Sequence, residues 1–269
     1  MQGARVLLTR PASQAQGVAA KIEAAGGVVM HLPLLEIDPV TAAVDVQRIK
    51  EQVMALDRYD IALFVSTNAA RIGLEWIRQY WPQLPAGLSA YTVGPGTAAI
   101  LREETWPVHC PDDGITSEHL LVLPGLQEVQ GKRVALFRGQ GGREVLAHTL
   151  RERGAMVDYI EIYQRRVPHY VRADVLQQMQ SMAINVAVLT SQQIVEAFID
   201  LLDVEQTRQG GGDAVLLTLL QTLRLIVPSQ RVADVAVSAG FAHVMDAGGA
   251  DDDTVVRSLM KCRQQAEFM

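Results

Sequence analysis

Short apolar runs alternate with amphipathic segments along this chain of 269 residues, and the alternation repeats itself. RVLLTRPASQAQGVAAKIEAAGGVVMHLPLLEI, from Arg5, and RVALFRGQGGREVLAHTLRERGAMVDYIEIYQR, from Arg133, follow one plan. Each has an apolar strand ending in an arginine, a turn, an amphipathic helix, a glycine and a second strand. Gly26 and Gly154 stand where the end of a helix needs a left-handed residue.

Two further pairs of segments extend the repeat. DIALFVSTNAARIGLEWI, from Asp60, matches INVAVLTSQQIVEAFIDLL, from Ile184, and each is a buried strand that runs into a hydroxyl-rich turn and a helix. YTVGPGTAAIL, from Tyr91, matches RLIVPSQRVADVA, from Arg224, more weakly. Short strands alternating with helical segments are typical of parallel α/β architecture. We therefore predict two similar α/β domains, each a parallel sheet with helices on both faces, in three layers.

The periodic pattern loosens in two places. Glu36–Pro39 and Arg165–Tyr170 are charged and contain proline, so they are the best candidates for a two-segment linker between the domains. The run Gly210–Gly212 predicts a flexible surface loop.

Composition restricts the partners. Hydrophobic residues make up 49% of the chain and charged residues 20%, as in soluble proteins with a substantial core. The formal net charge of −6 argues against nonspecific binding of nucleic acid, although it does not exclude a local basic cleft. Cys110 and Cys262 give no disulfide framework, the opening residues have no signal-peptide pattern, and Ala214–Val227 is too short and polar to span a membrane. We expect a cytoplasmic monomer.

The turns after the strands predict where a ligand binds, because parallel sheets bind ligands beyond their carboxyl ends. These turns are rich in hydroxyls, small residues and arginines, and contain no acidic residue. Amides at helix N-termini together with arginines favour a polyanion, although Ser and Thr at such turns also commonly cap helices. The residues are Thr9, Arg10, Ser66, Thr67, Asn68, Gly94, Gly96, Thr97, Arg138, Gly139, Gly142, Arg143, Thr190, Ser191, Ser229, Gln230 and Arg231.

FRGQGGRE, from Phe137 to Glu144, is the densest candidate segment. Its glycines allow close approach of the backbone, and Arg138 and Arg143 can each bind a carboxylate through two hydrogen bonds. The alternative is a flexible turn with solvated side chains.

Other chemistries fit less well. Gly94-Pro95-Gly96-Thr97-Ala98-Ala99 matches a dinucleotide-binding turn, but it lies in the middle of the chain, and no acid ends the next strand. Asp112 and Asp113 follow that strand and keep this interpretation open. The histidines have no metal-ligand spacing, so we expect no metal, and no phosphate loop or hydrolase signature occurs. Asp251–Asp253 predicts a solvated helix start.

Five motifs occur in one order along the chain: Leu7–Pro11, Phe64–Ala69, Val93–Ala98, Arg138–Gly139 with Gly142–Glu144, and Glu161–Arg165. Together they resemble uroporphyrinogen-III synthases, the tetrapyrrole-pathway enzymes that close hydroxymethylbilane into a ring. The resemblance covers nearly the whole chain.

The resemblance implies a domain arrangement that periodicity does not give. Domain one would consist of residues 1–36 and 168–269, and domain two of residues 37–167 with the linkers. The substrate cleft would lie between the domains, and the enzyme would need no cofactor.

The implied reaction removes the terminal hydroxyl of hydroxymethylbilane as water, which leaves an azafulvene. The last pyrrole ring is attacked at its substituted carbon, and a spiro intermediate recombines with that ring inverted. Geometric control is the main task, with a general acid at the departing oxygen. The substrate's eight carboxylates suit a cleft of amides, hydroxyls and arginines.

The resemblance assigns catalysis to Tyr163, whose phenol can donate a proton, and to Thr97. The alternative for Tyr163 is a hinge tyrosine that only packs. At the first domain's turns Pro228–Arg231 and Gln192 with Gln193 depart from the family pattern. The expected substrate-binding residues are Arg10, Ser66, Asn68, Gly94, Gly96, Arg138, Gly139, Arg143, Thr190, Ser191 and Ser229.

Two other functions remain as alternatives. The first is a cytoplasmic two-domain protein that binds or senses a small polyanion in its cleft. The second is a nucleotide-dependent oxidoreductase or transferase, which the missing acid and the missing phosphate loop disfavour.

Overall fold

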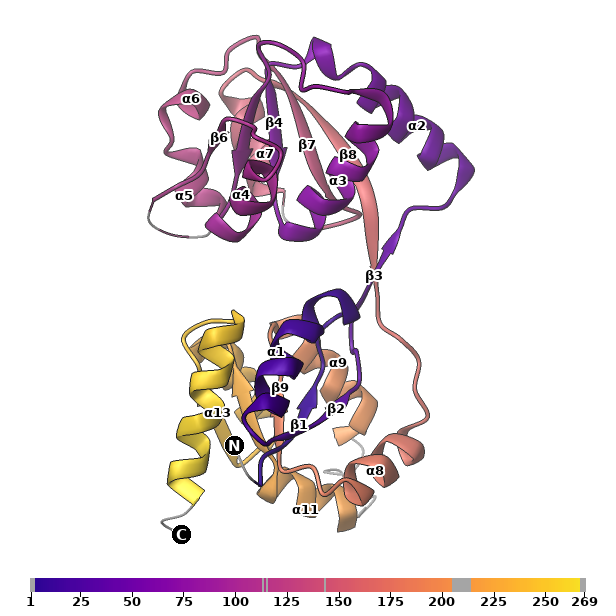
Figure 1. Cartoon of the computed structure of the whole chain (residues 1–269), viewed down its shortest axis with the longest axis vertical. Coiled ribbons are helices and arrows are strands. Elements are labelled where there is room, and N and C mark those ends of the chain that lie inside the picture. The colour runs from indigo at the N-terminus through magenta and orange to yellow at the C-terminus, as the bar shows by residue number, and fades with distance from the viewer. Residues whose placement is uncertain (1–2, 113, 115, 143, 205–213, 267–269) are drawn as a thin grey trace. The chain divides into compact units, whose positions relative to one another are not determined.

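The structure is a computed structural model that describes residues 3–112, 114, 116–142, 144–204 and 214–266, without the side chains of 263–266. The predicted glycine loop at Gly210–Gly212 lies outside these residues. The chain divides into two compact units, Met1–Glu36 with Arg166–Met269 (unit 1) and Ile37–Arg165 (unit 2) (Figure 1).

Unit 1 alternates strands and helices along both of its chain segments. Its elements are β1 Arg5–Leu8, α1 Ala12–Ala24, β2 Val28–His31, α8 Arg172–Ser181, β9 Val186–Val188, α9 Gln192–Leu202, α11 Ala214–Thr222, β10 Arg224–Val227, α12 Gln230–Ser238, β11 His243–Asp246 and α13 Asp252–Ala266.

Unit 2 is one continuous segment with the same alternation, preceded by an edge strand that begins at Glu36. Its elements are β3 Glu36–Pro39, α2 Ala43–Met54, the 3-10 turn η1 Leu56–Arg58, β4 Ile61–Phe64, α3 Thr67–Tyr80, β5 Ser89–Thr92, α4 Pro95–Arg102, β6 Val108–His109, α5 Ser117–Leu121, α6 Pro124–Gln127, β7 Arg133–Gly139, α7 Val145–Glu152 and β8 Met156–Arg166.

The two sheets have the same strand order. Unit 1 runs β2-β1-β9-β10-β11, and unit 2 runs β8-β7-β4-β5-β6 with β3 added beside β8. The strands of each of these five-strand series pair in parallel. In chain order unit 1 is the doubly wound order 2-1-3-4-5, and unit 2 has that order once its chain is read from β7. The predicted fold of two similar parallel-sheet units is confirmed, with unit 2 a circular permutation of unit 1.

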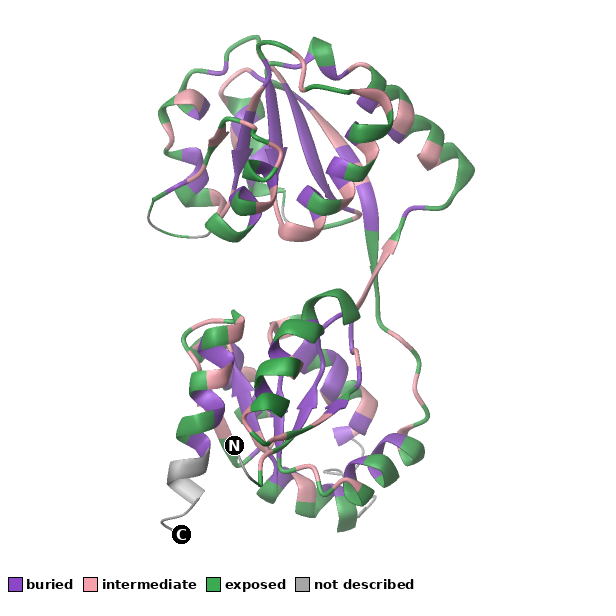
Figure 2. Cartoon of the chain, viewed as in Figure 1, coloured by how far each residue is buried: buried purple, intermediate pink, exposed green. Residues whose placement is uncertain are grey.

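Each sheet buries both faces, which gives three layers (Figure 2). In β1, Leu7 packs with residues of α8, α9, α11 and α12, whereas Val6 and Leu8 pack with residues of α1 and α13. In unit 2 the strand side chains divide in the same way between α2, α3 and α4 on one face and α5, α6 and α7 on the other. Strands buried on both faces read as continuous apolar runs, as these do.

The helix ends predicted from the repeat are also confirmed. Gly26 has φ +81° and Gly154 has φ +85°, so both take the left-handed conformation expected after α1 and α7. Ser66 and Ser191, at matching positions, cap α3 and α9 with their side chains.

The predicted linker segments are partly strands. Glu36–Pro39 forms β3 beside β8, and the backbone N–H of Val40 donates to the carbonyl of Ile162 at 3.3 Å. Arg166, the last residue of β8, forms an ion pair with Glu36. Pro39 is tolerated in β3 because the outer side of an edge strand makes no ladder hydrogen bonds, so the missing backbone N–H is not needed there. Residues 167–171 form neither helix nor strand.

Within the described residues, no helix combines the length and the apolar composition that crossing a membrane requires.

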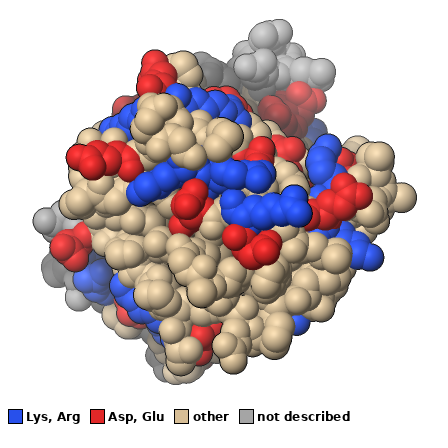
Figure 3. Space-filling view, turned by 90° about the horizontal axis from the view of Figure 1, so that it is seen from above, with Lys and Arg blue, Asp and Glu red and all other residues tan. Residues whose placement is uncertain are grey.

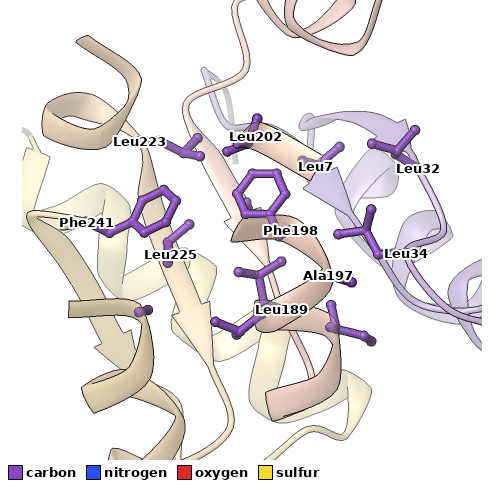
Figure 4. Packing of buried hydrophobic residues seen from close by; sticks show 14 of the residues in the cluster. Leu7, Leu32, Leu34, Leu189, Ala197, Phe198, Leu202, Leu223, Leu225 and Phe241 are labelled. Carbon is purple, nitrogen blue, oxygen red and sulfur yellow. The ribbon is translucent and has the colours of Figure 1, made fainter. Parts of the chain in front are cut away.

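A core test can be made at Phe198 of α9, which is 0% exposed and stacks against Phe241 with ring centroids 6.0 Å apart (Figure 4). We expect Phe198→Ala to lower the free energy of unfolding by about 3–5 kcal/mol, because the cavity adds to the lost burial. Val237→Ala on α12, where the side chain is 57% exposed, should change it by less than about 0.5 kcal/mol. Urea titrations measure both, and equal losses would contradict the described core.

Candidate functional site

Ligands of doubly wound sheets bind where the strand order reverses. That point lies between β7 and β4 in unit 2 and between β1 and β9 in unit 1. In unit 2 a cavity of about 310 Å³ lies at the carboxyl ends of these strands. Four of the residues picked out from the sequence line it: Arg138, Gly139, Gly142 and Tyr163. Arg143 lies outside the described residues.

Three polar residues of the cavity wall were missed: Thr116, Ser117 and Arg165. Thr116 caps α5, where its hydroxyl accepts from the backbone N–H of His119 at 3.5 Å, so it is a hydroxyl at a helix start like Ser66. Arg165 comes two residues after Tyr163 and so shares its side of β8. Both signals were present in the sequence.

A β-bulge directs Tyr163 into the wall. Arg138 pairs with Glu161, but Gly139 pairs with Tyr163, so Ile162 is the extra residue in β8. Ile162 and Tyr163 are adjacent in the sequence, and both are 0% exposed. Neighbouring side chains of a regular strand point to opposite faces, whereas here Ile162 and Tyr163 belong to the same core cluster.

The hydroxyl of Tyr163 is paired with Ser66. Tyr163 Oη and Ser66 Oγ are 3.1 Å apart, and either can donate. Ser66 Oγ also accepts from the backbone N–H of Ala69 at 3.1 Å, as the cap of α3. Two hydroxyls sharing one hydrogen bond use one of their two protons, and the second proton is available to another acceptor.

The glycines of FRGQGGRE make room for the side chains of the site. A Cβ on Gly139 would come within 2.4 Å of Cε2 of Tyr163, and a Cβ on Gly142 within 2.9 Å of Nη2 of Arg138. Gly142 also has φ +111°, which side chains rarely allow. These positions are glycine because Tyr163 and Arg138 occupy the space of a side chain.

Arg138 is 4% exposed, and its guanidinium contacts oxygen atoms of its own loop. Nε donates to the carbonyl of Gly139 at 3.2 Å, Nη2 donates to the carbonyl of Gly141, and Nη1 lies 3.3 Å from a carboxylate oxygen of Glu144. A buried guanidinium needs such partners to offset its lost hydration.

The N-termini of α3 and α4, which follow β4 and β5, lie next to each other. A Cβ on Gly96 would lie 3.8 Å from Cγ2 of Thr67, an ordinary contact, and Gly96 lacks a positive φ. Gly94 caps α4, and Thr97, in the first turn, is 5% exposed. Val65 and Val93 line the cavity, whereas Ser66, Asn68, Gly94, Gly96 and Thr97 are not among the cavity-lining residues.

Unit 1 has its own set of turns at the reversal of strand order. Thr9 Oγ1 donates to the carbonyl of Val188 at 2.7 Å, so a side chain just after β1 adds a link to β9. Ser191 Oγ accepts from the backbone N–H of Ile194 at 3.3 Å, next to Thr190. Ser229 caps α12 without a side-chain hydrogen bond to that helix.

Arg10 has a partner that sequence reasoning missed. Its Nη1 lies 2.6 Å from Oδ1 of Asp252, and its Nη2 donates to the carbonyl of Ala250. The predicted helix start at Asp251–Asp253 is confirmed, and the backbone N–H of Thr254 donates to Asp251 at 2.9 Å. Asp252 is more than a solvated residue, because it pairs with an arginine that is 4% exposed.

Charges of both signs lie close together on the face seen in Figure 3. Lys and Arg side chains there alternate with Asp and Glu, amid uncharged residues. Interleaved signs produce little net field, so the described residues of this face form no phosphate-binding stripe of the nucleic-acid kind.

Comparison with known proteins adds a family. A family model described as uroporphyrinogen-III synthase HemD matches residues 16–256. The chain is 31% identical over 258 residues to the uroporphyrinogen-III synthase of Escherichia coli strain K12, covering 94% of this chain and 99% of that protein. It is 38% identical over 170 residues to the enzyme of Proteus mirabilis, covering 62% of this chain and 82% of that protein.

Solved structures share the fold. A mutant uroporphyrinogen III synthase from the extremely thermophilic bacterium Thermus thermophilus aligns with TM-score 0.62 at 20% identity, over 98% of this chain and 100% of that one. Uroporphyrinogen-III synthetase from Helicobacter pylori aligns with TM-score 0.56 at 13% identity, over 96% and 99%. At these identities the likeness concerns the fold alone.

The packing of Gly139 against Tyr163 can be tested by stability. We expect Gly139→Ala to lower the free energy of unfolding by about 1–3 kcal/mol, since the new methyl group overlaps a buried ring. Gly96→Ala is the matched control, and should be neutral or stabilising by up to about 1 kcal/mol, because alanine favours a helix. Urea unfolding compares the two, and a neutral Gly139→Ala would show that the ring does not rest there.

Proposed function

The chain belongs to the uroporphyrinogen-III synthase family, and from this premise we propose how its residues close the substrate. The family activity is the cyclisation of hydroxymethylbilane in tetrapyrrole and heme biosynthesis, and the enzyme is a carbon–oxygen lyase. The proposed course is loss of the terminal hydroxyl as water, formation of an azafulvene, attack by the substituted carbon of the last ring, and a spiro intermediate that recombines with that ring inverted.

One observation supports the assignment of chemistry to unit 2. A buried phenol, Tyr163, and a buried guanidinium, Arg138, line the same cavity at the reversal of strand order. A cavity of about 310 Å³ is at the lower end of ligand pockets, so it accommodates part of a linear tetrapyrrole. We assign it to the reacting end of the substrate, with a carboxylate on Arg138.

In this proposal Tyr163 is the general acid. Ser66 donates to the phenol oxygen, which leaves the phenol proton for the departing hydroxyl, and water leaves as the carbon–oxygen bond breaks. After the spiro intermediate has opened, the unsubstituted α-carbon of the inverted ring forms the final bond and releases its proton, which restores the phenol, so the sum is one water lost. Tyr163 is 0% exposed and Ser66 is half-buried, so Ser66 is the member of the pair nearer to solvent.

In this proposal the N-termini of the helices at the strand ends bind the rest of the substrate. Gly96 supports it because the fold itself does not require a glycine there, and a bare backbone admits a carboxylate. Thr97 assists the leaving group or binds a carboxylate. The remaining proposed contacts are Arg10, Ser66, Asn68, Gly94, Gly139, Arg143, Thr190, Ser191 and Ser229.

The reaction is tested by its isomer. Enzymatically generated hydroxymethylbilane is supplied, and the oxidised products are separated by chromatography. We expect the type III isomer from the complete reaction and the type I isomer from the blank, because spontaneous closure does not invert the last ring. A product of type I alone would exclude the proposed function.

The role of Tyr163 is tested by Tyr163→Phe, which keeps the ring and removes the acid. We expect turnover to fall by about 10²-fold or more, with the free energy of unfolding lowered by about 1 kcal/mol for one lost hydrogen bond. Tyr80→Phe, a partly exposed ring on α3, is the control and should leave turnover unchanged. Unchanged turnover in Tyr163→Phe would remove Tyr163 from the catalytic role.

A further inference from the structure

Glu144, the last residue of FRGQGGRE, has no role in the proposed reaction, yet it contacts the guanidinium that lines the cavity. It lies just before α7, and its Oε1 is 3.3 Å from Nη1 of Arg138. Tyr159 of β8 donates its hydroxyl to the other oxygen, Oε2. All of these residues belong to unit 2.

The ring of Tyr159 packs against the guanidinium groups of Arg138 and Arg151. The guanidinium carbon of Arg138 lies 4.7 Å from the ring centroid, and that of Arg151 lies 5.0 Å from it. Cations over an aromatic face are attracted by its quadrupole. The ring therefore holds Arg138 in place, while the ring's hydroxyl holds Glu144 beside it.

Glu144 carries its charge in this setting. The hydrogen bond from Tyr159, followed by the nearby charge of Arg138, lowers the pKa of Glu144 below its ordinary value. Among the described residues it is the one carboxylate within ion-pair distance of Arg138. Its side chain is 64% exposed, so solvent weakens the contact.

The repeat supplies an internal comparison. Arg10 follows β1, the corresponding strand of unit 1, by two residues, and its carboxylate partner Asp252 lies at 2.6 Å with 33% of the side chain exposed. The contact of Arg138 with Glu144 is longer, and its acid is more exposed. The ion pair of Arg138 is therefore the weaker of the two.

We propose that Glu144 is an exchangeable counter-ion of Arg138, which it neutralises until a carboxylate of the substrate takes the same guanidinium edge. Tyr159 retains the displaced Glu144 near the site. This inference rests on the proposed function, in which Arg138 binds a substrate carboxylate. Glu144 acts through Arg138 and takes no part in the chemistry.

The test compares Glu144→Gln with Glu152→Gln. Glutamine at 144 keeps an oxygen for Tyr159 and removes the competing charge. Glu152 is the last residue of α7, is exposed and is paired with His148, so its replacement removes a charge without touching Arg138. We expect Glu144→Gln to lower KM for type III formation by about two- to fivefold, the range of one weak ion pair, with kcat unchanged. Glu152→Gln should leave both parameters unchanged.

Binding is measured separately from turnover, by calorimetric titration with uroporphyrinogen III kept reduced. The Kd should fall by the same factor in Glu144→Gln, and this gain should vanish in an Arg138→Gln background. A raised or unchanged KM and Kd in Glu144→Gln, or an equal gain in Glu152→Gln, would overturn the proposal. If the unaltered protein makes only the type I isomer, the proposed function fails, while the titration still reports on Glu144.

Discussion

Both units depend on one constraint: neighbouring parallel strands whose connections leave in opposite directions cannot have their carboxyl ends covered by the same helix. The reversal lies between β7 and β4 and between β1 and β9. Loop backbone and the starts of helices gather there, and the apolar faces of the sheets are already covered elsewhere. Polar side chains at these turns therefore lie outside the apolar core and are still held in position by the strand ends. The cavity beside Tyr163 follows from this arrangement.

Local signals made much of this predictable from the sequence. The left-handed glycines Gly26 and Gly154 and the capping serines Ser66 and Ser191 depend on residues three or four positions away, so a repeat in the sequence reveals them. The partners of the site side chains were not predictable in that way. Tyr163 meets Ser66 across 97 positions, and Arg10 meets Asp252 across 242. Such pairs depend on how strands are ordered and on a bulge, and apolar periodicity records neither.

The glycines of FRGQGGRE show how a correct motif can have a different physical reason. Glycines in such a turn suggest a backbone that admits a ligand, and at Gly96 nothing in the fold competes with that interpretation. At Gly139 and Gly142 the missing side chain is replaced by the protein itself, by the ring of Tyr163 and the guanidinium of Arg138. A glycine can therefore serve a site indirectly, by seating the residues that line the cavity.

The duplication clarifies why two arginines at equivalent places need not do equivalent work. A buried guanidinium must be neutralised in the free protein, and it can bind a new carboxylate only by giving up part of that neutralisation. Arg10 gets its counter-charge from the start of α13, a helix packed on the sheet with α1, so releasing Asp252 would loosen a core element. Arg138 gets its counter-charge from Glu144, whose side chain is mostly in solvent, so exchange disturbs little. The same strand end thus supplies a fixed tie in unit 1 and an exchangeable anion site in unit 2.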